Sequence, residues 1–230
     1  MYNDLMPIRS YEIRACDSCG LRYPLIEGHP FGLRCPVCMG ETRVVLRREL
    51  KDEIRDLKAE KVESGKRVAV LLDNIRSAWN VGSILRSADG FGFTHAYLCG
   101  ITPTPDNEAV TKTSLGAEDS VSWSYHKDAV KLVRGLKVEG WTVSALEEDA
   151  RATPLESDGL PSKLGEHTPP GRPSLQILIV GNEVTGVDPE LLDLCDQIFY
   201  IPMRGEKKSF NVAIAFGIAA YALGIQTASG

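Results

Sequence analysis

The chain has 230 residues, of which 43% are hydrophobic and 25% are charged, a composition that is ordinary for a folded globular protein. Its longest apolar run, residues 212–225, is too short to cross a bilayer, and the first residues lack the basic and apolar regions of a signal peptide. We therefore expect a cytoplasmic protein that does not enter the membrane.

The net charge of -5 argues against broad, non-specific binding of nucleic acid, but it leaves room for a local basic surface. Residues 1–70 carry 13 lysines and arginines against 11 acids, whereas the remaining residues carry 13 against 20. If the protein binds nucleic acid, the N-terminal part is the better candidate for the first contact. A partly solvated helix face explains the same charges equally well.

Two C-x2-C pairs separated by 15 residues stand near the N-terminus: Cys16, Cys19, Cys35 and Cys38. This spacing is typical of a four-thiolate zinc site, and a disulfide is less favoured because nothing indicates secretion. We expect residues 1–41 to form a zinc ribbon with a structural zinc ion. Whether the ribbon is only a rigid cap or contacts RNA through Arg22, Arg34 and Arg43 stays open.

Residues 42–63 are predicted to form a helix. Leu46, Leu50, Ile54 and Leu57 follow one another at spacings of four, four and three, which places them in one apolar stripe. The segment 42–65 then becomes a helical connector between the ribbon and the main domain.

From residue 66 onward, apolar strands alternate with helices. The expected strands are 67–72, 95–99, 121–125, 141–146 and the two that begin at Ile177 and Gln197; the expected helices begin near Asn80 and span 107–115, 127–138 and 212–225. The stretch 151–174 is rich in Pro, Gly and Ser and is expected to be a loop. The alternation predicts an α/β domain over residues 66–230, with a parallel sheet flanked by helices.

The last two strands lead into polar loops, Gly181–Gly186 and Ile201–Asn211, which together predict a ligand crevice at the carboxyl ends of the strands. No G-x-G-x-x-G follows a strand, and the G-x4-G of the first loop lacks the Lys and Ser/Thr of a phosphate-binding loop. The usual signatures for nucleotide phosphates are therefore missing. No catalytic Ser-His-acid pattern is apparent, and Cys99 and Cys195 are given no role.

Three segments in order, 80–86, 181–186 and 201–211, resemble the motifs of the SpoU-type (TrmH-like) RNA ribose 2′-O-methyltransferases of the SPOUT superfamily. Gly116-Ala-Glu118 resembles a segment between the first two motifs. The resemblance spans residues 67–225 and excludes the ribbon and the connector. It implies a deep C-terminal trefoil knot in the parallel sheet, a homodimer, S-adenosylmethionine as methyl donor, and a tRNA or rRNA substrate.

Carried over by position, the resemblance implies a cofactor pocket made by Ala145, Leu146, Gly181, Ile201, Met203 and Phe210. Phe210 replaces the more usual leucine. S-adenosylmethionine has no phosphates, which agrees with the missing phosphate loop. Gly181 is expected to let the backbone approach the ligand.

The resemblance also implies a catalytic group of Arg86, Asn80, Glu183, Ser209 and Asn211. Because an arginine stays protonated, we prefer Arg86 as an electrostatic clamp on the attacking 2′-oxygen or an adjacent phosphate, and the proton acceptor is left open. For Glu183, bonding to backbone amides of a neighbouring turn and direct catalysis are equally good hypotheses.

Two alternatives keep the same fold: a non-catalytic RNA-binding adaptor and a methyltransferase directed at an RNA base. The presence of all five polar residues of the catalytic group speaks against the adaptor.

Overall fold

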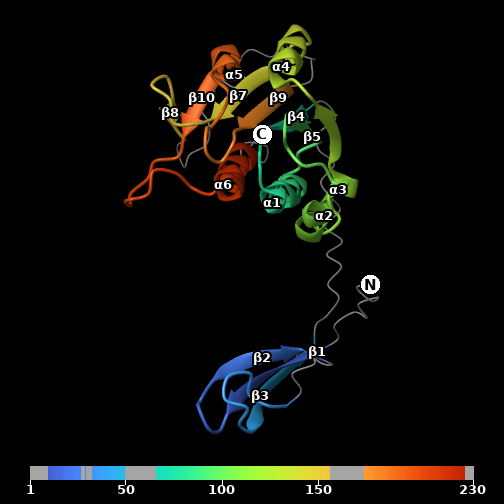
Figure 1. Ribbon diagram of the computed structural model, residues 1–230, viewed down its shortest axis with the longest axis vertical. Helices are drawn as coiled ribbons and strands as arrows, with labels where there is room; N and C mark the ends of the chain where they lie inside the picture. The colour runs from blue at the N-terminus through green and yellow to red at the C-terminus, as the bar shows by residue number, and fades with distance from the viewer. Residues whose placement is uncertain (1–9, 27–28, 30–32, 50–65, 156–173, 226–230) are drawn as a thin grey trace. The chain divides into compact units, whose positions relative to one another are not determined.

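The computed structural model describes residues 10–26, 29, 33–49, 66–155 and 174–225, and the chain divides into two compact units, Met1–Glu60 and Lys61–Gly230 (Figure 1). None of the helices in these stretches combines the length and apolar character that a membrane span requires.

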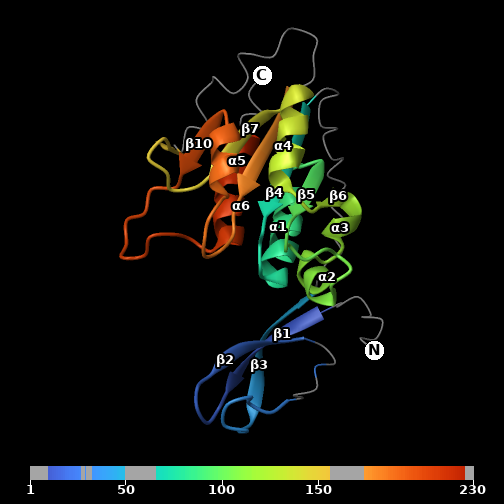
Figure 2. The same cartoon turned by 45° about the horizontal axis from the view of Figure 1, so that its top comes forward.

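Unit 1 is a three-stranded antiparallel sheet in the order β2-β1-β3 (Figure 2). Its strands are β1 (Ser10–Cys16), β2 (Arg22–Ile26) and β3 (Thr42–Glu49). The β1–β3 pairing contains one irregularity, because Ile13 pairs with Leu46 and Arg14 pairs with Val44. Val45 is therefore an extra residue in β3, which is a β-bulge.

The helix predicted for residues 42–63 is wrong over its first third, because residues 42–49 form the edge strand β3. The pairing with β1 is reinforced by the buried Arg14, whose guanidinium donates to both the hydroxyl and the carbonyl oxygen of Thr42 at 2.9 Å. Consecutive β-branched residues at 44 and 45 also favour a strand over a helix. Unit 1 thus continues beyond the predicted boundary at residue 41, and the rest of the predicted connector, 50–65, lies outside the described residues.

Unit 2 contains a seven-stranded parallel sheet in the order β6-β5-β4-β9-β7-β10-β8, which confirms the predicted fold class (Figure 1). The strands are β4 (Lys66–Asp73), β5 (His95–Cys99), β6 (Ser122–His126), β7 (Thr142–Leu146), β8 (Thr153–Pro154), β9 (Ser174–Val180) and β10 (Gln197–Tyr200). The late strand β9 is inserted between β4 and β7. The predicted loop 151–174 includes β8, and its residues 156–173 lie outside the described ones. The trefoil knot stays a prediction.

Helices cover both faces of this sheet (Figures 1 and 2). On one side lie α1 (Ala78–Gly90), α2 (Glu108–Ser114), α3 (Ala117–Ser120) and α6 (Val212–Ile225); on the other lie α4 (Ala129–Val138) and α5 (Pro189–Leu194). Alternate strand residues feed the two cores: Val70 and Leu72 pack toward α1 and α6, whereas Ala69 and Leu71 pack with α4 and α5. The short helix α3 was not predicted.

Helix α1 begins two residues earlier than predicted. Its N-cap is Ser77, whose hydroxyl accepts a hydrogen bond from the backbone N–H of Asn80, so Asn80 belongs to the first turn. Gly82 sets the position of α1 against α2: a Cβ added there would lie 2.3 Å from the carbonyl oxygen of Val110. The close backbone contact fixes the helix that carries Asn80 and Arg86.

Candidate active site

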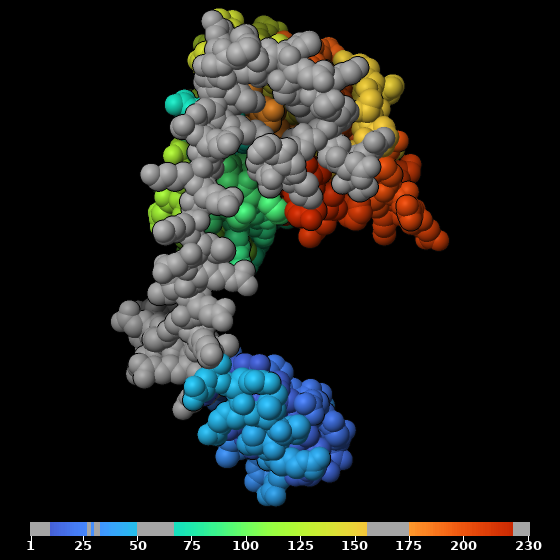
Figure 3. Space-filling model, turned by 180° about the vertical axis from the view of Figure 1, so that it is seen from behind, coloured from blue at the N-terminus to red at the C-terminus, as the bar shows by residue number. Residues whose placement is uncertain are grey.

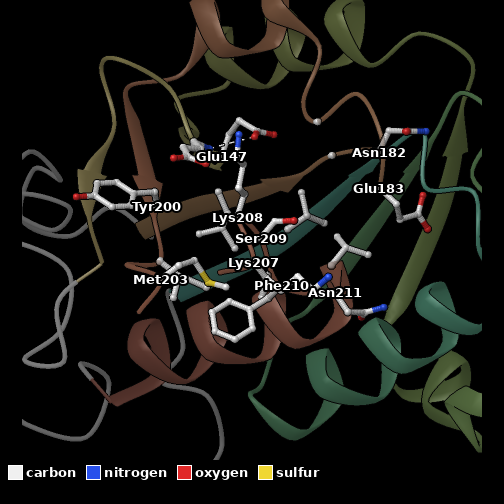
Figure 4. A pocket seen from close by; sticks show the side chains of 18 of the residues that line it. Glu147, Asn182, Glu183, Tyr200, Met203, Lys207, Lys208, Ser209, Phe210 and Asn211 are labelled. Carbon is white, nitrogen blue, oxygen red and sulfur yellow. Dashed lines mark hydrogen bonds between the residues drawn. The ribbon is translucent and has the colours of Figure 1, made fainter. Parts of the chain in front are cut away.

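A cavity of about 1050 Å³ opens at the carboxyl ends of β7, β9 and β10 (Figure 4). It is lined by residues 146–148 after β7, residues between 180 and 186 after β9, residues between 200 and 212 after β10, and Ala215 of α6. The cavity lies where the sequence predicts a crevice, since ligands of parallel sheets bind at this edge.

Five of the six residues predicted to bind the cofactor line this cavity: Leu146, Gly181, Ile201, Met203 and Phe210. The structure does not place Ala145 at the cavity. Its side chain is fully buried in the core on the α4 and α5 side. Successive residues of a strand point to opposite faces, so Leu146 reaches the cavity and Ala145 does not.

The cavity combines apolar walls with charged residues that the sequence analysis missed. Glu147 lines it, as do Lys207 and Lys208 of the loop after β10 (Figure 4). The carboxylate of Glu147 accepts a hydrogen bond from the backbone N–H of Val187 at 2.9 Å and so supports the turn that ends the loop after β9. The one signal in the sequence that points to Glu147 is its position directly after the predicted strand 141–146.

Gly181 is required by the loop itself. A Cβ at this position would lie 2.3 Å from the carbonyl carbon of Gly186 and 2.3 Å from the backbone nitrogen of Val187. The space that a side chain would need is therefore filled by the returning backbone of the same loop. This differs from the predicted reason, which was close approach of a ligand.

A buried acid joins the loop after β4 to the loop after β9. Asp73 is 2% exposed, and its carboxylate accepts hydrogen bonds from the backbone N–H of Asp188 at 2.9 Å and from the side-chain amide of Asn74 at 2.8 Å. Burial raises the pKa of Asp73 above its usual range, although the two hydrogen bonds act to lower it. The side chain of Asn182 in turn donates to the carbonyl oxygen of Asn74 at 2.6 Å.

Glu183 and Asn80 together connect the three motif segments. The carboxylate of Glu183 accepts hydrogen bonds from the backbone N–H groups of Arg76 at 2.9 Å and Ser77 at 3.0 Å, and from the side-chain amide of Asn80 at 2.9 Å. The side-chain oxygen of Asn80 accepts a further bond from Asn211 at 3.1 Å. Of the two hypotheses for Glu183, the contacts are those of the first: it bonds the amides of the neighbouring turn.

Ser209 lines the cavity, but Arg86 does not. Arg86 is exposed on α1, six residues beyond Asn80 or about 9 Å farther along the helix axis. The structure of one chain thus brings Glu183, Ser209 and Asn211 to the cavity, with Asn80 bonded to Glu183 and Asn211 behind its lining, and leaves Arg86 apart from it.

Unit 1 contains the four cysteines predicted to bind zinc. The sulfur atoms of Cys16, Cys19, Cys35 and Cys38 all lie within 4.8 Å of one another. The sulfur atoms of Cys16 and Cys38 are 3.4 Å apart, and those of Cys19 and Cys35 are 3.7 Å apart. Four sulfurs at 2.3 Å from one tetrahedral zinc ion would be about 3.8 Å apart, so the cluster fits such an ion. The backbone N–H of Cys19 lowers the pKa of the Cys16 thiol to about 6, which favours the thiolate that a metal requires.

The sequence and the fold were compared with those of known proteins. A sequence model of the SpoU rRNA Methylase family matches residues 67–221. The 23S rRNA (guanosine-2′-O-)-methyltransferase RlmB of Xanthomonas axonopodis pv. citri is 28% identical over 158 residues, which are 69% of this chain and 58% of that protein. The tRNA (guanosine(18)-2′-O)-methyltransferase of Thermus thermophilus is 32% identical over 153 residues, 66% of this chain and 71% of that protein.

Two solved structures share the fold. The SpoU methyltransferase AviRb from Streptomyces viridochromogenes, in complex with the cofactor AdoMet, has a TM-score of 0.60 at 23% identity, with 83% of this chain and 70% of that chain covered. The AdoMet-bound rRNA methyltransferase from Sinorhizobium meliloti has the same TM-score and identity, with 72% and 58% covered.

Replacement of Glu183 with glutamine is expected to destabilise unit 2 by about 1 kcal/mol at neutral pH, with allowance for solvent screening of this exposed carboxylate. Partial burial opposes the charged form, but the bonds from Arg76, Asn80 and Ser77 outweigh it and lower the pKa of Glu183. A carboxyl with a lowered pKa stabilises the fold above its unfolded pKa and loses that effect as the pH falls through the folded value. The difference between wild type and Glu183→Gln, measured by urea denaturation, should therefore shrink below about pH 4.

Glu190→Gln is the matched control, because Glu190 forms an exposed ion pair with Arg134 at 3.4 Å and should contribute little. Equal free energies of unfolding for wild type and Glu183→Gln at pH 7 would contradict the role given to Glu183.

Proposed function

Because the chain belongs to the SpoU rRNA methylase family, we propose that it transfers a methyl group from S-adenosylmethionine to a ribose 2′-hydroxyl of RNA. The observation that carries this proposal is the cavity at the carboxyl ends of β7, β9 and β10, joined by Glu183 and Asn80 to the helix that bears Arg86. The named relatives act on tRNA and on 23S rRNA, and tRNA or rRNA is the proposed substrate class. A cytoplasmic location follows from that substrate.

The residues present at the cavity fit S-adenosylmethionine. Leu146, Ile201, Met203 and Phe210 would hold its apolar parts, and the polar backbone of the loops after β9 and β10 would hold its adenine and ribose. When bound, the cofactor supplies a methyl group on a sulfonium centre, which is an electrophile. The protein has to align the ribose oxygen with that methyl group, and alignment accounts for much of the rate of such a displacement.

In this proposal Arg86 stabilises the 2′-oxygen as it loses its proton, or holds the phosphate next to it. Asn80 and Glu183 act as positioning residues, since Glu183 holds the backbone of Arg76 and Ser77 at the start of α1. The side-chain amide of Asn211 donates to Asn80, and its side-chain oxygen caps α6 by accepting from the backbone N–H of Ala213. These two bonds join the end of the loop after β10 to α1. Ser209 is the remaining polar side chain of the predicted group at the cavity.

Arg86→Ala should lower the rate of methyl transfer at least a hundredfold, because the side chain stabilises developing negative charge. Its affinity for S-adenosylmethionine, measured by calorimetry, should stay near that of the wild type, because Arg86 does not line the cavity. Transfer is measured as labelled methyl incorporation into tRNA and rRNA transcripts, followed by nuclease digestion and mass analysis.

The matched control is Arg134→Ala, which removes another exposed helix arginine far along the chain from the motifs. Wild-type turnover in Arg86→Ala would contradict its catalytic role. Methyl groups found on a base would overturn the ribose assignment, and absence of cofactor binding by the wild type would favour the adaptor.

We also propose that the four-cysteine cluster binds one structural zinc ion. The support is the near-tetrahedral spacing of the four sulfur atoms and the small size of unit 1, whose buried hydrophobic residues in the described part are Cys16 and Cys35. A unit with so small a core depends on a metal to fold.

Protein purified without chelators should therefore contain about one zinc ion per chain by elemental analysis. Cys35→Ser, which removes a fully buried ligand, should lose the metal and unfold unit 1 while S-adenosylmethionine binding to unit 2 is retained. Cys99→Ser, a buried cysteine outside the cluster, is the control and should keep the metal. A metal-free but folded wild-type protein would rule out the zinc site.

We infer, in addition, that the protein is a homodimer and that a second copy covers the outer face of α6. Ile214, Ile218 and Tyr221 recur at spacings of four and three and are 56%, 38% and 60% exposed. The ring of Phe91, at the end of α1, lies 6.2 Å from that of Tyr221 and extends this surface. Such a continuous apolar surface is unusual on a monomer.

Trp79, 60% exposed, shares a helix face with Arg86, so Arg86 adjoins apolar surface as well.

Ile218→Asp should convert the dimer to a monomer in sedimentation experiments, because it places a charge in the apolar contact. Ile101→Asp, at a position that is 65% exposed and outside this surface, should leave the dimer intact. A monomeric wild-type protein would contradict the dimer.

A further inference from the structure

The sheet of unit 1 has one open face, and the strand register defines it. Residues that pair across an antiparallel sheet point to the same side. Three rows result: Ile26–Tyr11–Arg48, Pro24–Ile13–Leu46 and Arg22–Ala15–Arg43. The bulge at Val45 brings Arg43 to the same side as Leu46 and Arg48, although positions 43 and 46 are three apart, a spacing that would place them on opposite sides of a regular strand. We call these nine residues the open face.

Burial distinguishes the open face from its opposite on the central strand β1, whereas both sides of β3 are exposed. All six residues of the open face on the edge strands β2 and β3 are exposed, including Ile26 at 39% and Leu46 at 40%. The other face carries the buried Arg14 and Cys16, which are 5% and 4% exposed. The zinc-binding turns contact that other face, since the hydroxyl of Tyr23 donates to the carbonyl oxygen of Arg34 there. Figure 3 shows β3, in light blue, at the surface of unit 1.

The charge of the open face has one sign. Arg22, Arg43 and Arg48 stand at its corners, and the acids of the strands, Glu12 and Glu49, point to the other side. Asp17 approaches Arg43 at 3.4 Å, so Arg22 and Arg48 contribute most of the free positive charge. A positive rim around an apolar centre is complementary to a polyanion that also exposes flat apolar groups.

We propose that the open face binds a single-stranded segment of the RNA substrate. The ring of Tyr11, with Ile13 and Pro24 beside it, offers a surface on which unpaired bases stack, and the arginines at the corners contact phosphates. Double-stranded RNA hides its base faces and would use the arginines alone. Unit 2 has more acids than bases, so the arginines of the open face would add to the RNA affinity of the full chain.

This inference rests on the proposed function for its choice of RNA, and it goes beyond that function in assigning the surface and the form of the RNA. Arg34, which the sequence also suggested as an RNA contact, is not part of this surface. It lies opposite Glu41 in a turn, outside the open face.

The experiment measures binding of a fluorescent 12-nucleotide oligouridine to the full chain by anisotropy over a range of KCl concentrations. Arg22→Gln/Arg48→Gln should weaken binding about tenfold and reduce the slope of log Kd against log salt by about 1.4, as expected for two lost phosphate contacts to a single strand. Tyr11→Leu keeps apolar volume but loses the ring; it should weaken binding about tenfold without a change in slope.

Arg34→Gln is the matched control and should bind as the wild type does. All variants are first checked for wild-type zinc content and for S-adenosylmethionine affinity, so failure of the cofactor site and failure of the open face give different results. Unchanged affinity and salt slope in Arg22→Gln/Arg48→Gln would overturn the proposal and leave the face to a protein partner. Equal loss of oligouridine and duplex RNA binding in Tyr11→Leu would overturn the single-strand assignment.

Discussion

The geometry of the candidate site depends on a chain of two polar contacts, from the Glu183 carboxylate to Asn80 and from Asn80 to Asn211, that joins three separate segments. Glu183, after β9, binds the backbone at the start of α1 and the side chain of Asn80, and Asn80 binds Asn211 at the start of α6. Glu183 and Asn211 are 103 and 131 residues away from Asn80 in the sequence, so no local rigidity can replace these contacts. Asp73 adds a further contact between the loops after β4 and β9, because its carboxylate accepts a hydrogen bond from the backbone N–H of Asp188. The cofactor half and the substrate half of the proposed site are thereby aligned before either ligand arrives.

Much of unit 2 could be predicted from its sequence because each strand is a short apolar run and each helix has one apolar side. Unit 1 could not be predicted in the same way. The predicted apolar stripe begins at Leu46 in strand β3, yet pairing with β1 and the buried Arg14 decides the conformation there. The start of α1 was placed at Asn80 because asparagine is a good cap, whereas Ser77 takes that place and Asn80 is held by Glu183 instead. In β3 a tertiary contact overrides a local preference, whereas at α1 one good local cap is used in place of another.

The motif residues led to the cavity, but two groups that support it were missed, and for Glu147 the one signal in the sequence is its place directly after a strand. Asp73 and Glu147 act on backbone amides 115 and 40 residues away, and no spacing rule connects such positions. Ala145 illustrates a different limit: it is adjacent to Leu146, but the alternation of the strand turns it into the opposite core. A position carried over from a family motif specifies a place on the backbone, and the direction of the side chain has to come from the fold.

The insertion of β9 between β4 and β7 has a consequence for how the protein is made. During synthesis β4 and β7 emerge before residues 174–180, which will pair with both of them. The side chains of both strands are largely apolar. Until β9 arrives, the nascent chain exposes two unpaired strand edges that are prone to aggregation. Closure then requires long-range parallel pairing, which is slow because a large loop must be ordered first. The risk of aggregation for unit 2 is therefore greatest during this interval, before the sheet closes.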